Sequence, residues 1–286
     1  MKTPKRLQSL MDDGLINEVV NELKSGKEAQ VYVVRCGDEL RCAKVFREAN
    51  KRGFKQAVQY QEGRKVRNSR RARAMAKRTR YGQKEQEAAW LNAEVDALYK
   101  LSDAGVRVPR PMGFVDGVLL MELVGDGEGN VAPRLDDMTL SPEQARAFHA
   151  RMISEVVRML DAGLIHGDLS EFNVLVGPDG PVIIDLPQAV NAAHNNSAAM
   201  MLIRDVDNMR RYFGRFAPEL LDTEYGLEIW SLYAAGLLSL DAELSGRFDR
   251  DRASVDMGDL LAVIEASREE EQERLEREQA WRDGDI

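Results

Sequence analysis

The chain has 286 residues, of which 44% are hydrophobic and 31% charged. This composition is typical of a globular protein with a sizeable core and excludes a wholly disordered chain. No apolar run approaches the roughly 20 residues that span a membrane, and the first residues lack a signal-peptide core, so we expect a cytoplasmic protein with no membrane partner. Two cysteines and three histidines provide neither a disulfide framework nor a metal-ligand spacing.

The charge is unevenly distributed along the chain. The net charge is −8, yet residues 47–84 contain 14 Lys and Arg side chains against two acids. The rest of the chain holds 26 basic and 46 acidic side chains. This asymmetry predicts either an anionic partner for the basic segment 47–84 or an electrostatic contact between that segment and the acidic body.

The first elements predict a small antiparallel sheet. Residues 10–23 are interpreted as a short amphipathic helix or an entry segment, and residues 25–29 as a glycine-containing turn. Residues 30–34 and 40–46 are rich in β-forming side chains, and turn residues separate them. They therefore predict a hairpin that follows the glycine-containing turn.

Lys44 is unusual because strand alternation places its side chain among apolar neighbours, where it either reaches solvent or has a partner. The helix predicted at residues 90–101 carries an acid in a similar position. At about 100° per residue, Glu94 lies about 60° from Leu91 around the helix axis, so it falls on the face that carries the apolar side chains of this helix. A buried carboxylate needs a cation, because desolvation of an unpaired charge is costly. We therefore expect Glu94 to pair with Lys44, with Glu87 as the alternative partner.

The middle of the chain predicts a buried strand, a hinge and a long helix. Pro109 and Pro111 interrupt the preceding pattern, and residues 117–124 are predicted to form a buried strand. Residues 125–133 are rich in Gly and Pro, which is typical of a hinge between two lobes. A capping-box pattern with proline at the first helical position opens a helix at Ser141.

The remaining chain is predicted to be mainly helical, with helices at residues 205–216 and 226–240. We expect three parts: an N-terminal lobe (1–124), a C-terminal catalytic lobe (125–266) and a charged tail (267–286). The tail carries acid–base pairs four residues apart and few apolar side chains, which indicates a solvated helix or a frayed end.

Three oxygen-bearing side chains flank one predicted hairpin. Asp168 and Asn173 precede strands 174–176 and 182–184, and Asp185 follows them. The hairpin folds Asp185 back beside the other two. Such a set without histidine or cysteine suits a hard cation such as Mg²⁺. His166, at the start of this segment, is expected to pack and hydrogen-bond locally.

These groups occur in the order of the working parts of a protein kinase: a phosphate-covering loop, a lysine, its glutamate, a catalytic aspartate, and two metal ligands. In that order they are residues 25–29, Lys44, Glu94, Asp168, Asn173 and Asp185. The five-residue step from Asp168 to Asn173 is that of the kinase catalytic loop. We therefore expect an α+β fold of two lobes, with a small antiparallel sheet in the first and a reduced, mainly helical second lobe.

Three segments closely resemble the RIO family of atypical serine/threonine protein kinases: residues 25–32, 166–173 and 184–188. The resemblance extends from about residue 25 to about residue 213. It implies a kinase domain with no preceding winged helix, ATP as nucleotide, Mg²⁺ with Mn²⁺ as a substitute, and an unidentified protein substrate. It also implies autophosphorylation, with ATP hydrolysis as an alternative output, and it favours Glu94 over Glu87.

The resemblance also assigns residue roles. Lys44, Glu94 and Asp168 are the candidate catalytic residues, and Asn173 and Asp185 the candidate metal ligands. The candidate nucleotide-binding residues are Ser25, Gly26, Lys27, Glu28, Val31, Cys42, Lys44, Glu122 and Leu123. The first four form the loop over the phosphates, the next two cover the adenine, and the last two contact its edge through the backbone.

Two alternatives remain open from the sequence. A small-molecule kinase of the aminoglycoside-phosphotransferase type has a similar loop, but residues 170–172, the basic segment 47–84 and the short helical region after Asp185 argue against it. An RNA- or ribosome-binding assembly factor could use nucleotide as a switch, with the cations of residues 64–80 neutralising phosphates. A solvated loop is the simpler interpretation of the same residues.

Overall fold

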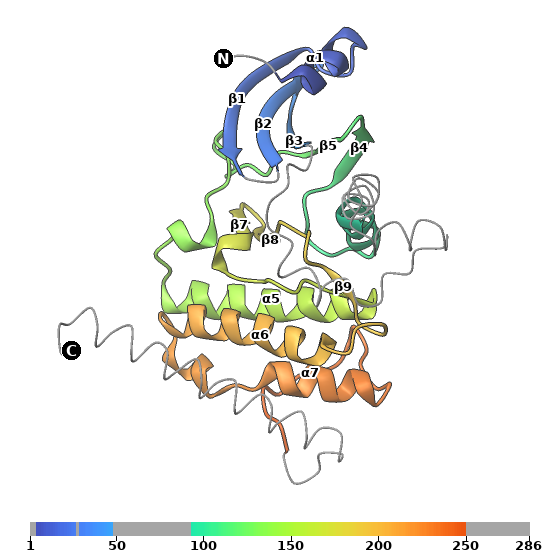
Figure 1. Ribbon diagram of the computed structural model, residues 1–286. Coiled ribbons are helices and arrows are strands. Elements are labelled where there is room, and N and C mark those ends of the chain that lie inside the picture. The colour runs from blue at the N-terminus through green and yellow to red at the C-terminus, as the bar shows by residue number, and fades with distance from the viewer. Residues whose placement is uncertain (1–3, 27–28, 48–92, 250–286) are drawn as a thin grey trace, which may run out of the picture.

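The protein has two lobes (Figure 1), seen in a computed structural model that describes residues 4–26, 29–47 and 93–249. The smaller lobe contains the strands β1 (Glu18–Ser25), β2 (Ala29–Cys36), β3 (Glu39–Phe46), β4 (Pro111–Val115) and β5 (Val118–Glu122). They form one antiparallel sheet in the order β1-β2-β3-β5-β4. The larger lobe is mainly helical, so the expected two-lobed α+β fold is confirmed.

The larger lobe is built on the helices α5 (Pro142–Asp161), α6 (Ala198–Gly214) and α7 (Tyr225–Ala234), which lie in successive layers in Figure 1. Its strands are β6 (Leu164–Ile165), paired with β9 (Val190–Asn191), and β7 (Val174–Gly177), paired with β8 (Gly180–Ile183). Its short 3-10 helices are η1 (Leu135–Asp137), η2 (Glu171–Asn173) and η3 (Pro218–Asp222). None of the helices in the described ranges is long and apolar enough to cross a membrane.

The helix or entry segment expected at residues 10–23 is wrong as a single element. The helix is α1 (Lys5–Asp12), and the following residues form β1, which pairs with β2. The buried side chains of Leu7 and Leu10 pack against the sheet face that carries Ala43 and Val45. α1 therefore covers this face of the sheet, and pairing with β2 decides the conformation of residues 18–25, which the sequence alone leaves ambiguous.

The strand β4 was not expected, because two prolines interrupt the sequence there. Pro111 is the first residue of β4, and β4 lies at the edge of the sheet. Proline is tolerated at the start of an edge strand, because a residue in that position need not donate an N–H to the hydrogen bonds of the sheet. The expected hairpin of β2 and β3 and the buried strand β5 are present.

The predicted long helix is confirmed as α5, and its start is capped as expected. The Ser141 hydroxyl accepts from the amide of Gln144, and the Gln144 side chain accepts from the amide of Ser141. The other two helix predictions were displaced: α6 begins at Ala198, before the expected residue 205, and α7 ends at Ala234, before residue 240.

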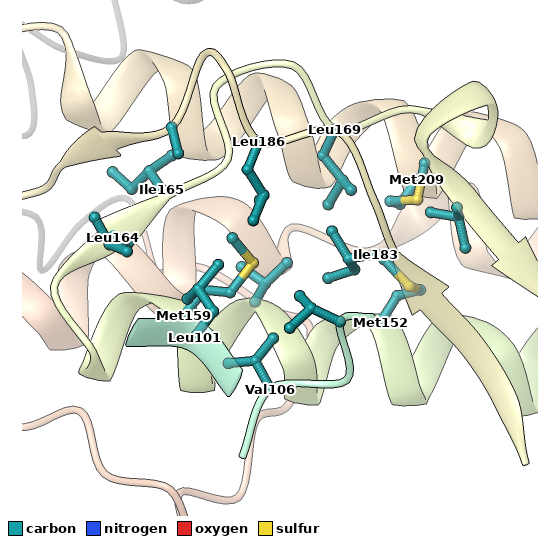
Figure 2. Close-up of a cluster of buried hydrophobic side chains, with 14 of the residues drawn as sticks. Leu101, Val106, Met152, Met159, Leu164, Ile165, Leu169, Ile183, Leu186 and Met209 are labelled. Carbon is teal, nitrogen blue, oxygen red and sulfur yellow. The ribbon is translucent and has the colours of Figure 1, made fainter. Parts of the chain in front are cut away.

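One core joins the two lobes (Figure 2). Leu101, within the helix of residues 93–103, and Val106, which follows it, belong to the same buried cluster as Met152 and Met159 of α5. Leu169 of the loop before η2 belongs to it too. The helix of residues 93–103 is thereby held against the larger lobe, so the acid it carries is placed by core packing.

Candidate active site

Lys44 on β3 contacts two carboxylates from distant parts of the chain. Its Nζ lies 2.5 Å from Oε1 of Glu94, on the helix of residues 93–103. The same Nζ lies 3.1 Å from Oδ1 of Asp185, which follows β8. The contact expected between Lys44 and Glu94 is present, while the alternative partner, Glu87, lies outside the described residues.

Burial and charge act in opposite directions on this cluster. The side chains of Lys44 and Glu94 are only 14% and 5% exposed. Burial alone would lower the pKa of Lys44, but the charges of Glu94 and Asp185 outweigh it and raise the pKa above its ordinary value. The Lys44 side chain is therefore a permanent cation between two lobes.

The hairpin of β7 and β8 brings the polar side chains together. The amide of Ile184 donates to the carbonyl of Asn173 at 2.9 Å, so Asp185 follows a residue bonded directly to Asn173. The Nδ2 of Asn173 donates to the carbonyl of Asp168 at 2.8 Å. The nitrogen of the Asn173 side chain is thus engaged, which leaves its Oδ1 as the atom suited to a metal ion.

Asp185 has a left-handed backbone, with φ at 67°. This conformation is uncommon for residues other than glycine, although aspartate and asparagine tolerate it best. Burial alone would raise the pKa of Asp185, but the charge and hydrogen bond of Lys44 outweigh it, and the pKa is lowered. The charge of Lys24, at the end of β1, contributes in the same direction. Lys24 is the cross-strand partner of Val31, which pairs in turn with Lys44, so this cation lies on the same face of the sheet as Lys44, and sequence reasoning missed it.

Asp168 is solvent-accessible and sits beside a buried histidine. Partial burial raises the pKa of Asp168, and Asp185 adds to this, while His166 and Arg204 oppose it. His166 is 2% exposed, and its Nδ1 accepts from the Asp168 amide at 3.3 Å. Its Nε2 therefore carries the proton and donates to the carbonyl of Ile184 at 3.0 Å. The local packing role expected for His166 is confirmed.

Asp205 on α6 holds the loop around Asp168, and sequence reasoning missed it. Its two carboxylate oxygens accept from the amides of Gly167 at 2.7 Å and Leu169 at 3.1 Å, on either side of Asp168. The neighbouring Arg204 donates to the carbonyl of Gly167. Burial raises the pKa of Asp205 to about 7, although these contacts oppose the shift.

A signal for this anchor was available in the sequence. Leu202, Val206 and Met209 form an apolar stripe on α6, and all three are buried. Asp205 falls within that stripe, as Glu94 does within its own helix. The argument that singled out Glu94 applies equally to Asp205, which is 2% exposed.

Val31 and Cys42 lie on the same face of the sheet as Lys44. Val31 is the cross-strand partner of Lys44, and Cys42 precedes Lys44 by two residues, so all three side chains point to one side. Val31 is half-buried. Burial raises the pKa of the Cys42 thiol to about 12, which keeps it neutral. The two expected adenine-covering residues thus form an apolar surface next to the ammonium.

Glu122 ends β5, where the chain passes between the lobes, and most of its polar groups are engaged. Its amide donates to the carbonyl of Arg110 at 2.9 Å. Its carboxylate forms an ion pair with Arg107 and accepts from the amide of Arg110. A backbone contact from Glu122 to an adenine would therefore use its carbonyl oxygen. Leu123, the other residue expected at the adenine edge, is half-buried and follows β5 directly.

The glycine-containing loop connects β1 and β2. The amide of Gly26 donates to the carbonyl of Ala29 at 2.9 Å and closes the turn. Ser25, at the end of β1, accepts at its hydroxyl from Nη2 of Arg47 at 2.9 Å. Two further candidates of this loop lie outside the described residues: Lys27 and Glu28.

The donor chemistry of the site fits a hard divalent cation. Asn173 and Asp185 supply oxygen atoms, and in the described residues no cluster of three or more His, Cys, Asp and Glu side chains could hold a metal by itself. A site with two protein ligands suits a cation that completes its coordination with phosphate oxygens and water, as Mg²⁺ does. The expected pair of ligands is thus chemically consistent with such an ion.

Comparison with known protein families gives one match that covers most of the chain. The model of the RIO domain matches residues 30–225. This range includes Lys44, Glu94, Asp168 and Asp185.

Comparison with curated proteins finds archaeal and eukaryotic relatives. A protein of Haloferax volcanii named RIO-type serine/threonine-protein kinase Rio1 is 34% identical over 73% of this chain and 68% of its own length. A protein of the same name from Methanocaldococcus jannaschii is 33% identical over 75% of this chain and 69% of its own. The human serine/threonine-protein kinase RIO1 is 30% identical over 77% of this chain, but only 37% of its own length is covered.

Proposed function

The chain belongs to the RIO family of serine/threonine kinases, and we propose that it transfers the γ-phosphate of ATP to serine or threonine hydroxyls, including its own. The observation that supports this most is the position of Lys44 between Glu94 and Asp185. A fixed cation between the lobes is what a triphosphate needs, because phosphoryl transfer depends mainly on positioning and charge stabilisation.

In the proposed mechanism, Glu94 orients Lys44 so that its ammonium neutralises phosphate charge. Asn173 and Asp185 would hold one or two divalent cations, Mg²⁺ or Mn²⁺, which would neutralise further phosphate charge. Asp168 accepts the proton of the acceptor hydroxyl. Its raised pKa supports this role, since a general base works best when its pKa lies closer to the working pH.

The same arrangement fixes the geometry in which Asp168 acts. Asp205 holds the amides on both sides of it, and Asn173 is bonded to its carbonyl. Preorganised loops of this kind lower the barrier, because no reorganisation is needed when the reaction occurs. The nucleotide base would lie against Val31 and Cys42, with the backbone of Glu122 and Leu123 at its edge.

Incubation with γ-labelled ATP and Mg²⁺ or Mn²⁺ tests this proposal. Label should enter the protein as phosphoserine or phosphothreonine, and Asp168→Asn should reduce the rate of incorporation by about 10²–10⁴-fold. Release of labelled phosphate without any phosphoprotein would instead identify ATP hydrolysis as the output. Label on a small alcohol or aminoglycoside, with none on protein, would overturn the proposal in favour of a small-molecule kinase.

The basic segment 47–84 remains a candidate contact for RNA or a ribosomal particle. Only Arg47 of this segment lies within the described residues, and its guanidinium is bonded to Ser25. The local excess of 12 positive charges predicts RNA binding that weakens steeply with salt. Filter binding at two salt concentrations, with and without residues 64–80, tests it. RNA affinity that the deletion leaves unchanged would refute this role.

A further inference from the structure

Arg107 forms a two-pronged ion pair with Glu122, the last residue of β5. Its Nη2 lies 2.8 Å from Oε1 of Glu122 and its Nη1 lies 3.0 Å from Oε2. The two side chains are 36% and 28% exposed. Paired, parallel hydrogen bonds between a guanidinium and a carboxylate fix the orientation of both groups, which a single contact does not. The end of β5 is therefore oriented by a side chain from another segment.

The backbone of Arg107 is bonded to two elements of the larger lobe. Its amide donates to Oε2 of Glu155 on α5 at 2.8 Å. Its carbonyl accepts from the amide of Ile183 at 2.9 Å. Ile183 ends β8, and Asp185 follows two residues later. Arg107 therefore contacts both the end of β5, where the chain passes between the lobes, and β8, which is followed by the candidate metal ligand Asp185.

Arg107 is also placed by the core on both sides. Its neighbours Val106 and Val108 are 4% and 3% exposed and belong to the cluster that joins the lobes. The backbone of Arg107 therefore has little freedom, and its side chain transmits that fixed position to Glu122.

We propose that Arg107 is a positioning residue for the nucleotide: its ion pair with Glu122 sets the place of the adenine edge relative to the metal-binding end of β8. This inference rests on the proposed ATP-dependent function. It predicts that loss of the pair affects the adenine half of the nucleotide. The triphosphate half is unaffected, because Lys44, Asn173 and Asp185 are held by other contacts.

The two halves of ATP can be tested separately. Labelled ATP is bound to the full-length protein with Mg²⁺ and displaced either by adenosine or by magnesium tripolyphosphate. Arg107→Met should raise the inhibition constant of adenosine about tenfold. This change corresponds to the loss of one strong oriented contact of about 1.4 kcal/mol. The inhibition constant of tripolyphosphate should stay within about twofold of the wild-type value.

Three further variants sharpen the test. Arg107→Lys keeps the charge without the two-pronged geometry and should fall between wild type and Arg107→Met. Glu122→Gln removes the partner charge, retains a side-chain acceptor for the Arg110 amide, and should resemble Arg107→Met. Arg146→Met breaks an arginine–glutamate contact of similar type between α5 and η3, with Glu219 at 2.5 Å, and should leave both displacements unchanged.

The outcomes separate this inference from the proposed function. Equal weakening by both competitors would mean that Arg107 acts only as a general structural support, and unchanged adenosine displacement in Arg107→Met and Glu122→Gln would mean that the pair has no positioning role. Either result overturns the inference alone. A wild-type protein that binds no ATP would overturn the proposed function and this inference together.

Discussion

The ammonium of Lys44 lies 3.1 Å from the carboxylate of Asp185, which is 141 positions later in the chain. This contact joins β3 of the smaller lobe to the residue that follows β8 in the larger one. It depends on the relative placement of the two lobes, which the shared core fixes. Four predictions follow from this contact and its neighbours.

Lys44→Met is expected to lower the free energy of unfolding by about 3–5 kcal/mol, because it removes the ammonium that contacts the buried carboxylate of Glu94. Adding Glu94→Gln should recover part of that loss, since a neutral amide is less costly to bury than a carboxylate that has lost this contact. Urea unfolding of the two single variants and the double variant measures this. A matched control is Arg35→Met, which breaks the exposed pair with Glu18 and should cost less than about 1 kcal/mol. A double variant no more stable than Lys44→Met would contradict the prediction.

Asp168→Asn is expected to reduce phosphoryl transfer by about 10²–10⁴-fold while ATP binding is retained. Its pKa is raised mainly by partial burial, so the wild-type rate should fall as the pH drops through a pKa above the ordinary aspartate range. The reason is that a protonated carboxyl cannot accept the hydroxyl proton. The pH dependence of kcat for both proteins checks this. Persistence of the acidic limb in Asp168→Asn would show that another group titrates.

Asp185→Asn is expected to keep the fold, because asparagine tolerates the left-handed backbone at this position. The stimulation of ATP binding by divalent cations should decrease by at least about tenfold, since a charged oxygen ligand is lost. Titration of ATP with Mg²⁺ and then with EDTA measures this stimulation. Asp179→Asn, in the exposed turn between β7 and β8, is a control that should behave as wild type. Equal Mg²⁺ stimulation in both variants would exclude Asp185 as a ligand.

Asp205→Asn is expected to change how stability depends on pH. The folded-state pKa of Asp205 is raised by burial to about 7, so between about pH 4 and 7 the folded state binds more protons than the unfolded state. The wild-type free energy of unfolding should therefore fall, relative to that of Asp205→Asn, by up to about 1.4 kcal/mol per pH unit as the pH rises through this window.

At the low-pH end of this window the variant should also be less stable than the wild type by about 1–3 kcal/mol, because an amide can satisfy only one of the two backbone N–H groups that Asp205 accepts. Urea unfolding at pH 5, 6 and 7 gives both quantities. A stability difference between wild type and Asp205→Asn that stays constant from pH 5 to 7 would show that this carboxyl is ionised throughout and would contradict the prediction.

Local patterns account for the elements that were predicted well. The cap at Ser141 and the apolar spacing after it define α5 without reference to the rest of the chain. Local geometry indicated Glu94 as the partner of Lys44 and left Glu87 as the alternative, because a charge on an apolar face needs an opposite charge nearby, and the resemblance to the RIO family then favoured Glu94. The expected contact at residues 47–84 is untested, since all but Arg47 lies outside the described residues.

What the sequence determined by itself was the identity and order of the chemical groups: a lysine on one strand, a glutamate on one helix, and three oxygen-bearing side chains around one hairpin. Those inferences needed only short-range periodicity and turn chemistry. The tertiary structure alone decided that residues 18–25 form β1, that the loop around Asp168 is the partner of the buried Asp205, and that Arg107 contacts both β5 and β8. Each of these depends on a partner far away in the chain, and the free energy of such a contact comes from packing and desolvation that exist only once the fold has formed.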